Sequence, residues 1–546
     1  MRLTAEAPLF DFIVVGAGSA GAVLANRLSA NGEHRVLLIE AGGEMRGMKY
    51  EMPVAWFAAA MDPANGWGYR SEPEPALDGR TIDAARGRVM GGSSSINGMM
   101  YIRGNRLDYD RWNVPGWRYA DVLPYFRRAE AHAGGASTYH GGDGPMAVTP
   151  IARNPALYPR FLAAARELGY DETDDFNGVR QDGFNLPDFT IRRGRRAGTA
   201  SAYLAPARKR PNLTVESHAL ARRIVVEDGR AVAVEFQRDG ATHRARARRE
   251  VIVSAGTFNS AQLLLLSGIG PGAELAANGI AVTIDAPQVG RNLQEHVIIS
   301  CGYRASRPVT FENVLRMDRM LAAAIRWRVF GSGPLGGMPM AIQGFVRSRE
   351  GLDRPDLQMF VTEASMTSQP WFPGLKAGAG HQFTGSAALL HPESRGSVTL
   401  RSADAADPPR LRFNLLAEAA DRATARDAVR LIRGLFATTA VRDVVAEETL
   451  PGAAIQGAAA IDAYLRESVM GGAHPVGTCA MGTDAGSVVD AELRVRGVLG
   501  LRVADCSVIP TILSGNTNAA AIMIGEKAAD LVLARAPLAP AHLPAA

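Results

Sequence analysis

The sequence predicts a mixed α/β fold, because its N-terminal segment reads as a strand, a glycine-rich turn, a helix, a second strand and an acid. We expect residues 12–15 (FIVV) to form a buried strand, residues 16–21 (GAGSAG) the turn, and residues 36–39 (VLLI) a strand that ends at Glu40. This order is typical of the Rossmann-like βαβ unit that binds a dinucleotide. A lone glycine turn would be weak support, but here the strands, the helix and the acid accompany it.

The small residues of the turn each have a physical reason. Gly16 permits the tight turn, Gly18 lets the backbone approach a pyrophosphate, and Gly21 lets helix and strand pack closely. The N-terminus of the helix would then face the phosphates. Glu40 would accept hydrogen bonds from ribose hydroxyls and would repel a 2′-phosphate, which disfavours NADP. The motif alone leaves both FAD and NAD open.

A second loop of small residues occupies residues 87–98 (GRVMGGSSSING) and runs into the apolar residues 99–102. Glycine and serine remove side-chain bulk, so backbone amides can contact a flat ligand directly. A flexible linker is the alternative interpretation, but linkers rarely contain residues such as Val89 and Met90. The loop therefore predicts a second cofactor contact.

The loop of residues 87–98 resembles the first signature of the glucose-methanol-choline (GMC) oxidoreductases, a family of FAD enzymes, and residues 256–271 resemble the second. Residues 474–482 (HPVGTCAMG) resemble the segment that holds the family's catalytic histidine. Residues 501–510 and 515–518 resemble its closing flavin and active-site segments. The matches follow the family order over nearly the whole chain, and the pattern is most similar to the choline-dehydrogenase-like bacterial branch. The resemblance implies FAD as the cofactor.

The resemblance also implies a Rossmann-like FAD-binding domain with an interleaved substrate domain built on an antiparallel sheet. Residues 1–156, 205–304 and 466–546 are expected to form the discontinuous FAD-binding domain. Residues 157–204 and 305–465 are expected to form the substrate domain.

Local patterns predict single elements within this plan. Helices are expected over residues 157–168 and 417–435, and strands over residues 213–216, 357–361 and 397–400. A further signal, Asp-Gly between two apolar runs near residue 228, is typical of a β-hairpin.

Composition excludes some partners. The chain has 546 residues, is 47% hydrophobic and 21% charged, and carries a net charge of +5. Because the basic residues are scattered, no nucleic-acid partner is expected. The densest basic run, residues 192–196 (RRGRR), is expected to be a solvated loop, with a charged partner site as the alternative.

Cysteine usage and hydropathy bear on location. Cys301, Cys479 and Cys506 have no metal-binding spacing and no disulfide framework, so we expect no metal site and a reducing, cytoplasmic compartment. No stretch reaches the ~18 apolar residues of a transmembrane helix. No signal peptide is expected before the first strand.

Alcohol oxidation requires a base for the hydroxyl proton and an acceptor for the hydride, which a flavin takes at N5. By itself, a histidine before proline is more often structural, but the resemblance implies that His474 is the base. Asn516 matches the second active-site position, where its amide would hold the alcohol oxygen, and Asn518 is the rival. His296 and His140 are interpreted as structural.

Some family members bind FAD covalently through a histidine in the loop of residues 87–98. Ile96 stands at that position, so FAD is expected to be non-covalent. The FAD contacts implied by the motifs and the resemblance are Gly16, Gly18, Ser19, Ala20, Gly21, Glu40, Ala41, Val89, Gly92, Asn97, Gly98, Met99, Ala221, Asp505, Asn516 and Thr517.

The substrate is less defined. Choline-oxidising relatives place an acid in the pocket to meet the quaternary ammonium, whereas Ala341 stands at the matching position, so choline is doubtful. Met338, Met340, Ile342 and Phe345 suit an apolar pocket for an aliphatic or aromatic primary alcohol, or equally the core.

The sequence therefore predicts an FAD-dependent alcohol dehydrogenase that yields an aldehyde and passes electrons to a quinone or another carrier. An oxidase that uses O₂ and releases H₂O₂ is the alternative. A non-redox lyase or a light-driven decarboxylase on the same scaffold, and an NAD-binding redox enzyme, are the remaining hypotheses.

Overall fold

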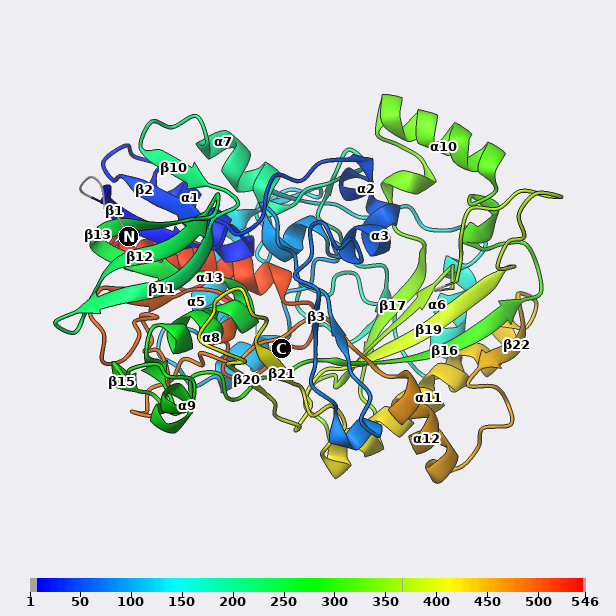
Figure 1. Cartoon of the computed structure of the whole chain (residues 1–546). Helices are drawn as coiled ribbons and strands as arrows, with labels where there is room; N and C mark the ends of the chain where they lie inside the picture. Colours follow the sequence, from blue (N-terminus) through cyan, green and yellow to red (C-terminus); the bar gives the residue numbers. More distant parts are fainter. Residues whose placement is uncertain (1–6, 366, 544–546) are drawn as a thin grey trace.

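The structure is a computed structural model, and it describes residues 7–365 and 367–543. Two seven-stranded β-sheets organise it, one on the left and one on the right of Figure 1. Each sheet takes its strands from separate stretches of the sequence. The predicted fold class, a Rossmann-like unit with an interleaved unit on an antiparallel sheet, is confirmed.

The first sheet is the Rossmann-like unit. Its strands are β1 (Leu9–Val15), β2 (Val36–Ile39), β10 (Leu213–Glu216), β11 (Leu220–Glu227), β12 (Arg230–Arg238), β13 (Ala241–Val253) and β24 (Leu501–Val503). The order β10-β2-β1-β13-β24 is parallel throughout, and the antiparallel hairpin β11–β12 pairs with the other half of β13. The hairpin turns at Asp228 and Gly229, whose φ angles of 48° and 73° fit the predicted Asp-Gly turn.

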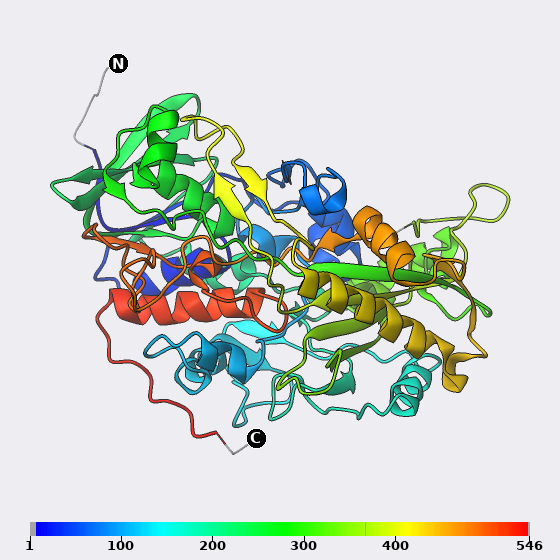
Figure 2. The same cartoon turned by 90° about the horizontal axis from the view of Figure 1, so that it is seen from below.

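Helices cover this sheet. The helix of the βαβ unit is α1 (Ser19–Leu28), which packs against α13 (Asn518–Val532). In turn α13 packs against α5 (Tyr119–Ala129), and α8 (Gly256–Leu266) contacts β11. Figure 2 shows α13 as a long red helix on the left of the molecule. The N-terminal ends of α1 and α13, far apart in sequence, therefore lie near each other.

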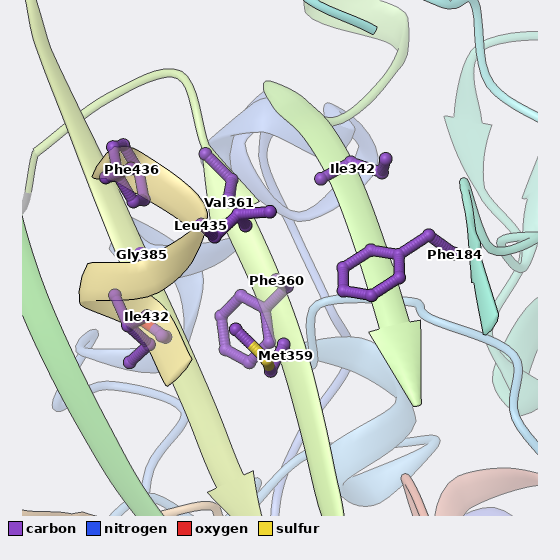
Figure 3. A pocket seen from close by; sticks show the side chains of 10 residues that line it. Phe184, Ile342, Met359, Phe360, Val361, Gly385, Ile432, Leu435 and Phe436 are labelled. Carbon is purple, nitrogen blue, oxygen red and sulfur yellow. The ribbon is translucent and has the colours of Figure 1, made fainter. Parts of the chain in front are cut away.

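The second sheet is antiparallel. Its strands are β7 (Gly183–Asn185), β16 (Val297–Ala305), β17 (Met340–Val346), β18 (Leu357–Thr362), β19 (Gln382–Leu389), β22 (Val445–Leu450) and β23 (Met470–Gly471). One face is covered by α6 (Tyr158–Glu167), which packs on β17, and by α11 (Ala419–Ala437), which packs on β16 and β19. Figure 3 shows an apolar space beside α11, which Ile342 and Met359 of the sheet line together with Ile432 and Leu435 of the helix.

The predicted domain boundaries fall close to elements of the second sheet. The boundary after residue 304 would assign most of β16 to the first unit. The boundary at residue 466 would assign β23 to the first unit as well, although β23 pairs with β16. We propose that the second unit begins before β16 and extends through β23.

The basic run of residues 192–196 is not wholly a solvated loop. It forms the hairpin β8 (Ile191–Arg192) and β9 (Arg195–Arg196), in which Arg192 and Arg193 are exposed. Arg196 is buried, because its guanidinium donates to the carbonyl oxygens of Tyr50 and Asn97. The prediction was wrong for Arg196: these carbonyls compensate the burial of its charge in part, and burial lowers its pKa to about 9.

Shorter elements complete the chain. The remaining helices are α2 (Met48–Glu51), α3 (Trp56–Ala60), α4 (Arg106–Arg111), α7 (Ala205–Ala207), α9 (Gly272–Ala277), α10 (Met317–Phe330) and α12 (Ala458–Ser468). The remaining strands are β3 (Tyr69–Arg70), β4 (Asp83–Ala84), β5 (Glu130–His132), β6 (Met146–Val148), β14 (Ile269–Gly270), β15 (Ile284–Asp285), β20 (Ser397–Thr399) and β21 (Arg410–Arg412). Among the described residues, no helix is long and apolar enough to span a membrane, and no cluster of side chains has the composition of a metal site.

Candidate active site

The two residues predicted to act on the alcohol are in contact. The Nε2 atom of His474 lies 2.9 Å from the Nδ2 atom of Asn516. His474 follows Ala473, whose φ of 62° turns the chain sharply, and Asn516 follows Gly515, whose φ is 145°. Both sharp turns bring side chains from loops to one point between the two sheets, just before α13 begins.

A chain of hydrogen bonds fixes which nitrogen of His474 is free. His474 Nδ1 lies 3.0 Å from His296 Nδ1, and His296 Nε2 lies 2.9 Å from the carbonyl oxygen of Leu513. A carbonyl only accepts, so His296 carries its proton on Nε2; burial also lowers the pKa of His296 to about 4, which keeps it neutral. His296 Nδ1 is then an acceptor, and His474 must donate to it from Nδ1. The lone pair of His474 is therefore on Nε2, the nitrogen beside Asn516.

The second sheet orients the amide of Asn516 from the other side. Gln358 on β18 donates from Nε2 to Asn516 Oδ1, at 3.3 Å, and to Gln343 Oε1 on β17, at 3.2 Å. Both glutamine side chains are buried. Because Asn516 Oδ1 is held by a donor, its Nδ2 group is the part that faces His474.

A buried carboxylate anchors the backbone of both histidines. Glu295 Oε1 accepts from the amide of His474 at 2.7 Å and from the amide of His296 at 2.9 Å. Burial raises the pKa of Glu295 to about 7, against the opposing effect of Arg86 and of the two amides. Arg86 also donates to the carbonyl oxygen of Ala473. Burial, and then the neighbouring His296 and Arg86, lower the pKa of His474 well below its usual value, so its imidazole is neutral at pH 7.

The two predicted cofactor loops touch each other. The amide of Gly91 donates to the carbonyl oxygen of Ala17 at 2.9 Å. A Cβ atom added to Gly92 would lie 2.7 Å from the Cα atom of Gly18, and one added to Gly16 would lie 2.4 Å from the carbonyl oxygen of Ser254, just after β13. Only glycine permits this approach, so the backbones of residues 16–21 and 87–98 form one cradle, as a pyrophosphate site requires.

Glu40 lies at the edge of this cradle and is buried. Its two carboxylate oxygens accept from the amides of Ala17 and Gly42, each at 2.8 Å. Each oxygen keeps a further lone pair that can accept from a ribose hydroxyl. The amide of Ala219 donates to the Glu40 carbonyl at 2.8 Å, which brings Ala221 on β11 toward the same segment.

Asn97 is held by Arg196, which donates to its side-chain oxygen at 2.7 Å and to its backbone oxygen at 2.6 Å. The same side-chain oxygen accepts from the amide of Met99 at 3.1 Å. Ile96 is buried in an apolar cluster with Tyr50, and its side chain has no atom that could bond covalently to a flavin.

The last predicted contacts lie near the N-terminal ends of α1 and α13. The hydroxyl of Ser19 donates to Asn518 Oδ1 at 2.7 Å, and Thr517 precedes α13. Asp505 accepts from the amide of Gly256 at 2.9 Å and so ties the start of α8 to the C-terminal segment. The remaining predicted contacts belong to the same segments and are Ala20, Gly21, Ala41, Val89 and Gly98. Direct contact of all these residues with FAD stays a prediction.

The apolar residues proposed for the substrate pocket divide between core and site. Ile342, on β17, lines the same apolar space as residues of α11 (Figure 3), and Phe345 is buried against Phe176, with ring centroids 5.2 Å apart. These two residues belong to the core. Met338 and Met340 pack in a separate cluster that also contains Met99 and Phe360, so they remain the candidates for a pocket wall.

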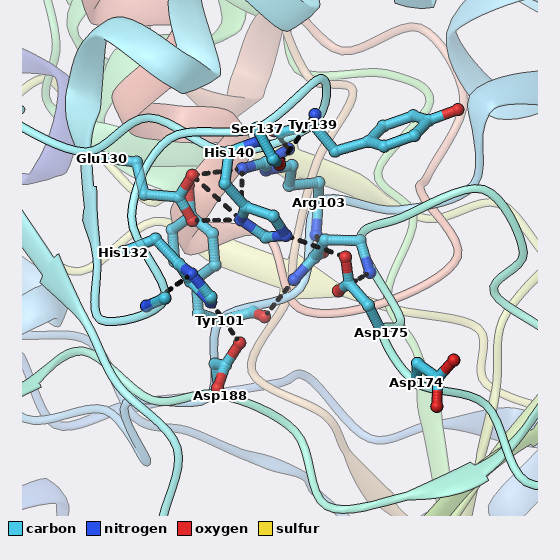
Figure 4. A network of polar contacts seen from close by, with 12 residues as sticks. Tyr101, Arg103, Glu130, His132, Ser137, Tyr139, His140, Asp174, Asp175 and Asp188 are labelled. Carbon is cyan, nitrogen blue, oxygen red and sulfur yellow. Dashed lines mark hydrogen bonds and ion pairs between the residues drawn. The ribbon is translucent and has the colours of Figure 1, made fainter. Parts of the chain in front are cut away.

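His140 lies in a separate ion-pair network (Figure 4). It bonds to Glu130 through Nδ1 at 3.1 Å and to Asp175 through Nε2 at 2.8 Å. Burial lowers its pKa, but the bonds to Asp175 and Glu130 outweigh burial and raise the pKa of His140 to about 9. Arg103 pairs with Glu130 at 2.6 Å, and both side chains are fully buried. None of these bonds reaches His474 or Asn516, which fits the structural role that we expected for His140.

Several residues of the site were not anticipated. His296 was interpreted as structural, yet it bonds directly to His474. The sequence offered a signal here, since the ionisable residues Glu295 and His296 are adjacent. Gln343 and Gln358 lacked any signal, because only pairing of the second sheet brings Gln358 to Asn516 and Gln343 to Gln358.

Comparison with known proteins now identifies the family. The model of the N-terminal part of the GMC oxidoreductases matches residues 10–298, and that of the C-terminal part matches residues 392–525. The chain belongs to the GMC oxidoreductase family. FAD is therefore its cofactor, and the glycine cradle described above fits such a group.

Similar proteins of this family cover nearly the whole chain. An oxygen-dependent choline dehydrogenase of Rhizobium etli is 44% identical over 97% of this chain and 96% of its own, and one of Photobacterium profundum is 42% identical over 98% and 95%. Among solved structures, pyridoxine 4-oxidase from Mesorbium loti is 31% identical, with a TM-score of 0.85 over 95% of this chain and 98% of its own. A formate oxidase of Aspergillus oryzae RIB40 is 27% identical, with a TM-score of 0.89 over 97% and 99%.

Proposed function

We propose that this GMC oxidoreductase oxidises a primary alcohol to an aldehyde, with His474 as the base and Asn516 as the group that holds the alcohol oxygen. The observation that carries the proposal is the ordered hydrogen-bond chain, which leaves a lone pair on His474 Nε2 beside the N–H donor of Asn516. FAD, when bound, supplies the acceptor for the hydride.

The alcohol hydroxyl would take the place of the direct bond between His474 and Asn516. Its proton would go to His474 Nε2, while Asn516 Nδ2 donates to its oxygen and stabilises the developing negative charge. The imidazolium that forms keeps its Nδ1 bond to His296, and the nearby carboxyl of Glu295 offsets its charge when ionised. Gln358 keeps the amide of Asn516 in the donating orientation throughout.

The proposed substrate is a neutral alcohol with an aliphatic or aromatic body. Ala341, fully buried at a bulge of β17, stands at the position where the resemblance to choline-oxidising enzymes implies an acid, and a methyl group cannot pair with a quaternary ammonium. Met338, Met340 and Phe360 offer apolar surface instead. The proposed neutral alcohol thus differs from choline, the substrate named for the similar choline dehydrogenases.

For the electron acceptor we propose a quinone or another carrier. Molecular oxygen is the second candidate, because the similar choline dehydrogenases are called oxygen-dependent and similar solved structures are oxidases. The proposed compartment is cytoplasmic, in keeping with three free cysteines, of which Cys301 and Cys479 are buried.

The test mixes the purified protein anaerobically with benzyl alcohol, hexanol or choline, each in a separate sample, and measures the absorbance of the flavin. We expect bleaching with the neutral alcohols and little with choline. Recovery of colour in air with release of H₂O₂ would identify an oxidase, and recovery only with a quinone a dehydrogenase. Absence of bleaching with every primary alcohol would contradict the proposal and favour a non-redox reaction.

A further inference from the structure

One helix of the second unit presents an apolar stripe to solvent. α10 projects at the upper right of Figure 1, and Trp327 is the one buried residue among its 14. Leu321, Ile325 and Val329 are 62%, 57% and 65% exposed. Because they recur every four residues, they lie along one face of the helix. Phe330, 74% exposed, ends the helix and lies about 100° around its axis from Val329, outside this stripe.

Apolar exposure continues beyond the start of α10. The amide of Met317 donates to the carbonyl oxygen of Trp371 at 2.9 Å, so the loop after Trp371 adjoins the helix. This loop exposes Phe372 (40%) and Leu375 (78%). Scattered exposed apolar residues are normal on a protein surface, but neighbouring ones of this size indicate an interaction site.

The stripe is bordered by positive charge. On a helical projection, Arg319 and Arg326 flank it on one side and Arg328 on the other. None of these three arginines forms an ion pair with another residue that the structure describes, and Asp318, the helix's one acid, is paired with Arg316 at 2.6 Å. Their charges are therefore available to an anionic partner.

A second basic element borders the C-terminal end of α10. The backbone of the β8–β9 hairpin touches that end, because a Cβ atom added to Gly194 would lie 2.1 Å from the carbonyl oxygen of Gly331. Arg192 and Arg193 are the exposed residues of this hairpin, and neither is in an ion pair within the described part of the chain. The hairpin adds two charges to those of the helix.

We propose that α10 and the β8–β9 hairpin form a docking surface for a membrane that contains anionic lipids. An apolar stripe bordered by arginine is the pattern of a helix that lies in the plane of a lipid interface, with its apolar side chains among the acyl chains and its cations at the headgroups. A second copy of the chain is a poorer occupant, because a symmetric contact would bring these unpaired arginines against each other. The proposal is independent of the alcohol and of the acceptor.

The experiment uses the FAD-loaded protein and co-sedimentation with vesicles. One set contains phosphatidylcholine alone, and the other also contains phosphatidylglycerol. We expect binding to the second set, weak binding to the first, and release from the second at high salt, because screening weakens headgroup attraction. Absence of binding to anionic vesicles, or binding that is indifferent to both lipid charge and salt, would overturn the proposal.

A matched pair of variants locates the surface. Leu321→Glu places a charge in the stripe, whereas Leu499→Glu changes an equally exposed leucine (67%) that is bonded to the β11–β12 turn at the other end of the molecule. We expect Leu321→Glu to lower vesicle affinity by about tenfold or more and Leu499→Glu to leave it unchanged, with melting temperature and alcohol oxidation in solution unaltered in both. Equal affinities in the two variants would overturn the proposal. The proposal would also be overturned if the protein did not bind vesicles and instead formed a concentration-dependent dimer that Leu321→Glu abolishes. In that case a second copy of the chain would cover the stripe.

Discussion

Replacement of His296 tests whether it sets the proton arrangement of His474. In His296→Leu, the Nδ1 proton of His474 loses its acceptor, which lies 3.0 Å away in the native protein. A buried donor left without a partner costs about 1–3 kcal/mol. Since 1.36 kcal/mol is a factor of ten in rate, the bleaching rate should fall by roughly 5- to 150-fold if that cost falls on the transition state. The assay is the rate of anaerobic flavin bleaching at saturating alcohol, normalised to bound FAD.

His296→Asn is the matched control, because the Oδ1 atom of asparagine takes the place of His296 Nδ1 as an acceptor. We expect this variant to recover most of the rate lost in His296→Leu, although both lose the bond to the Leu513 carbonyl. Equal rates in the two variants, with equal losses of melting temperature, would refute the reasoning, because His296 would then act only as packing.

Three further predictions follow from the same geometry. Asn516→Ala should lower kcat/KM by about 10- to 1,000-fold through loss of the N–H donor to the alcohol oxygen, and unchanged kcat/KM would contradict its role. Because burial lowers the pKa of His474, the fall of kcat/KM at acid pH that is caused by protonation of His474 should have its midpoint below pH 6.5. A midpoint above pH 7 that is assigned to His474 would refute this. Glu130→Gln should destabilise the protein by about 3–5 kcal/mol in urea unfolding, since the buried Arg103 loses its partner, and a loss under 1 kcal/mol would contradict it.

The His140 network predicts a dependence of stability on pH. Its folded-state pKa of about 9 exceeds the ordinary value of 6.5, so its stabilising effect is complete below pH 6.5 and is lost as pH rises through 9. His140→Gln should flatten the fall in unfolding free energy between pH 6.5 and 9, measured by urea titration. A variant that keeps the full slope would show that another group titrates.

Local sequence patterns were sufficient to predict the parts of the fold that depend on backbone conformation at neighbouring residues. Asp228-Gly229 predicted the hairpin because few residue pairs adopt two positive φ angles. Gly16 predicted a tight turn, and its φ of 98° fits one. The resemblance then supplied His474 and Asn516, which proved to be neighbours.

What the sequence could not supply depends on distant contacts. Arg196 looked solvated within its run of arginines, and only the loop around Asn97 gives its guanidinium carbonyl partners. The role of His296 depends on the Leu513 carbonyl, more than 200 residues away. Pairing of β17 with β18 brings Gln343 and Gln358 together, and no local pattern encodes that register.

The most direct test of the central claim compares the native protein with His474→Ala in anaerobic bleaching by a primary alcohol. Both proteins should bind FAD equally, because the cradle residues are unchanged. We predict that the native flavin bleaches and that the variant bleaches about 10²- to 10⁴-fold more slowly, with partial rescue by added imidazole. Equal bleaching rates in the two proteins would contradict the assignment of His474 as the base.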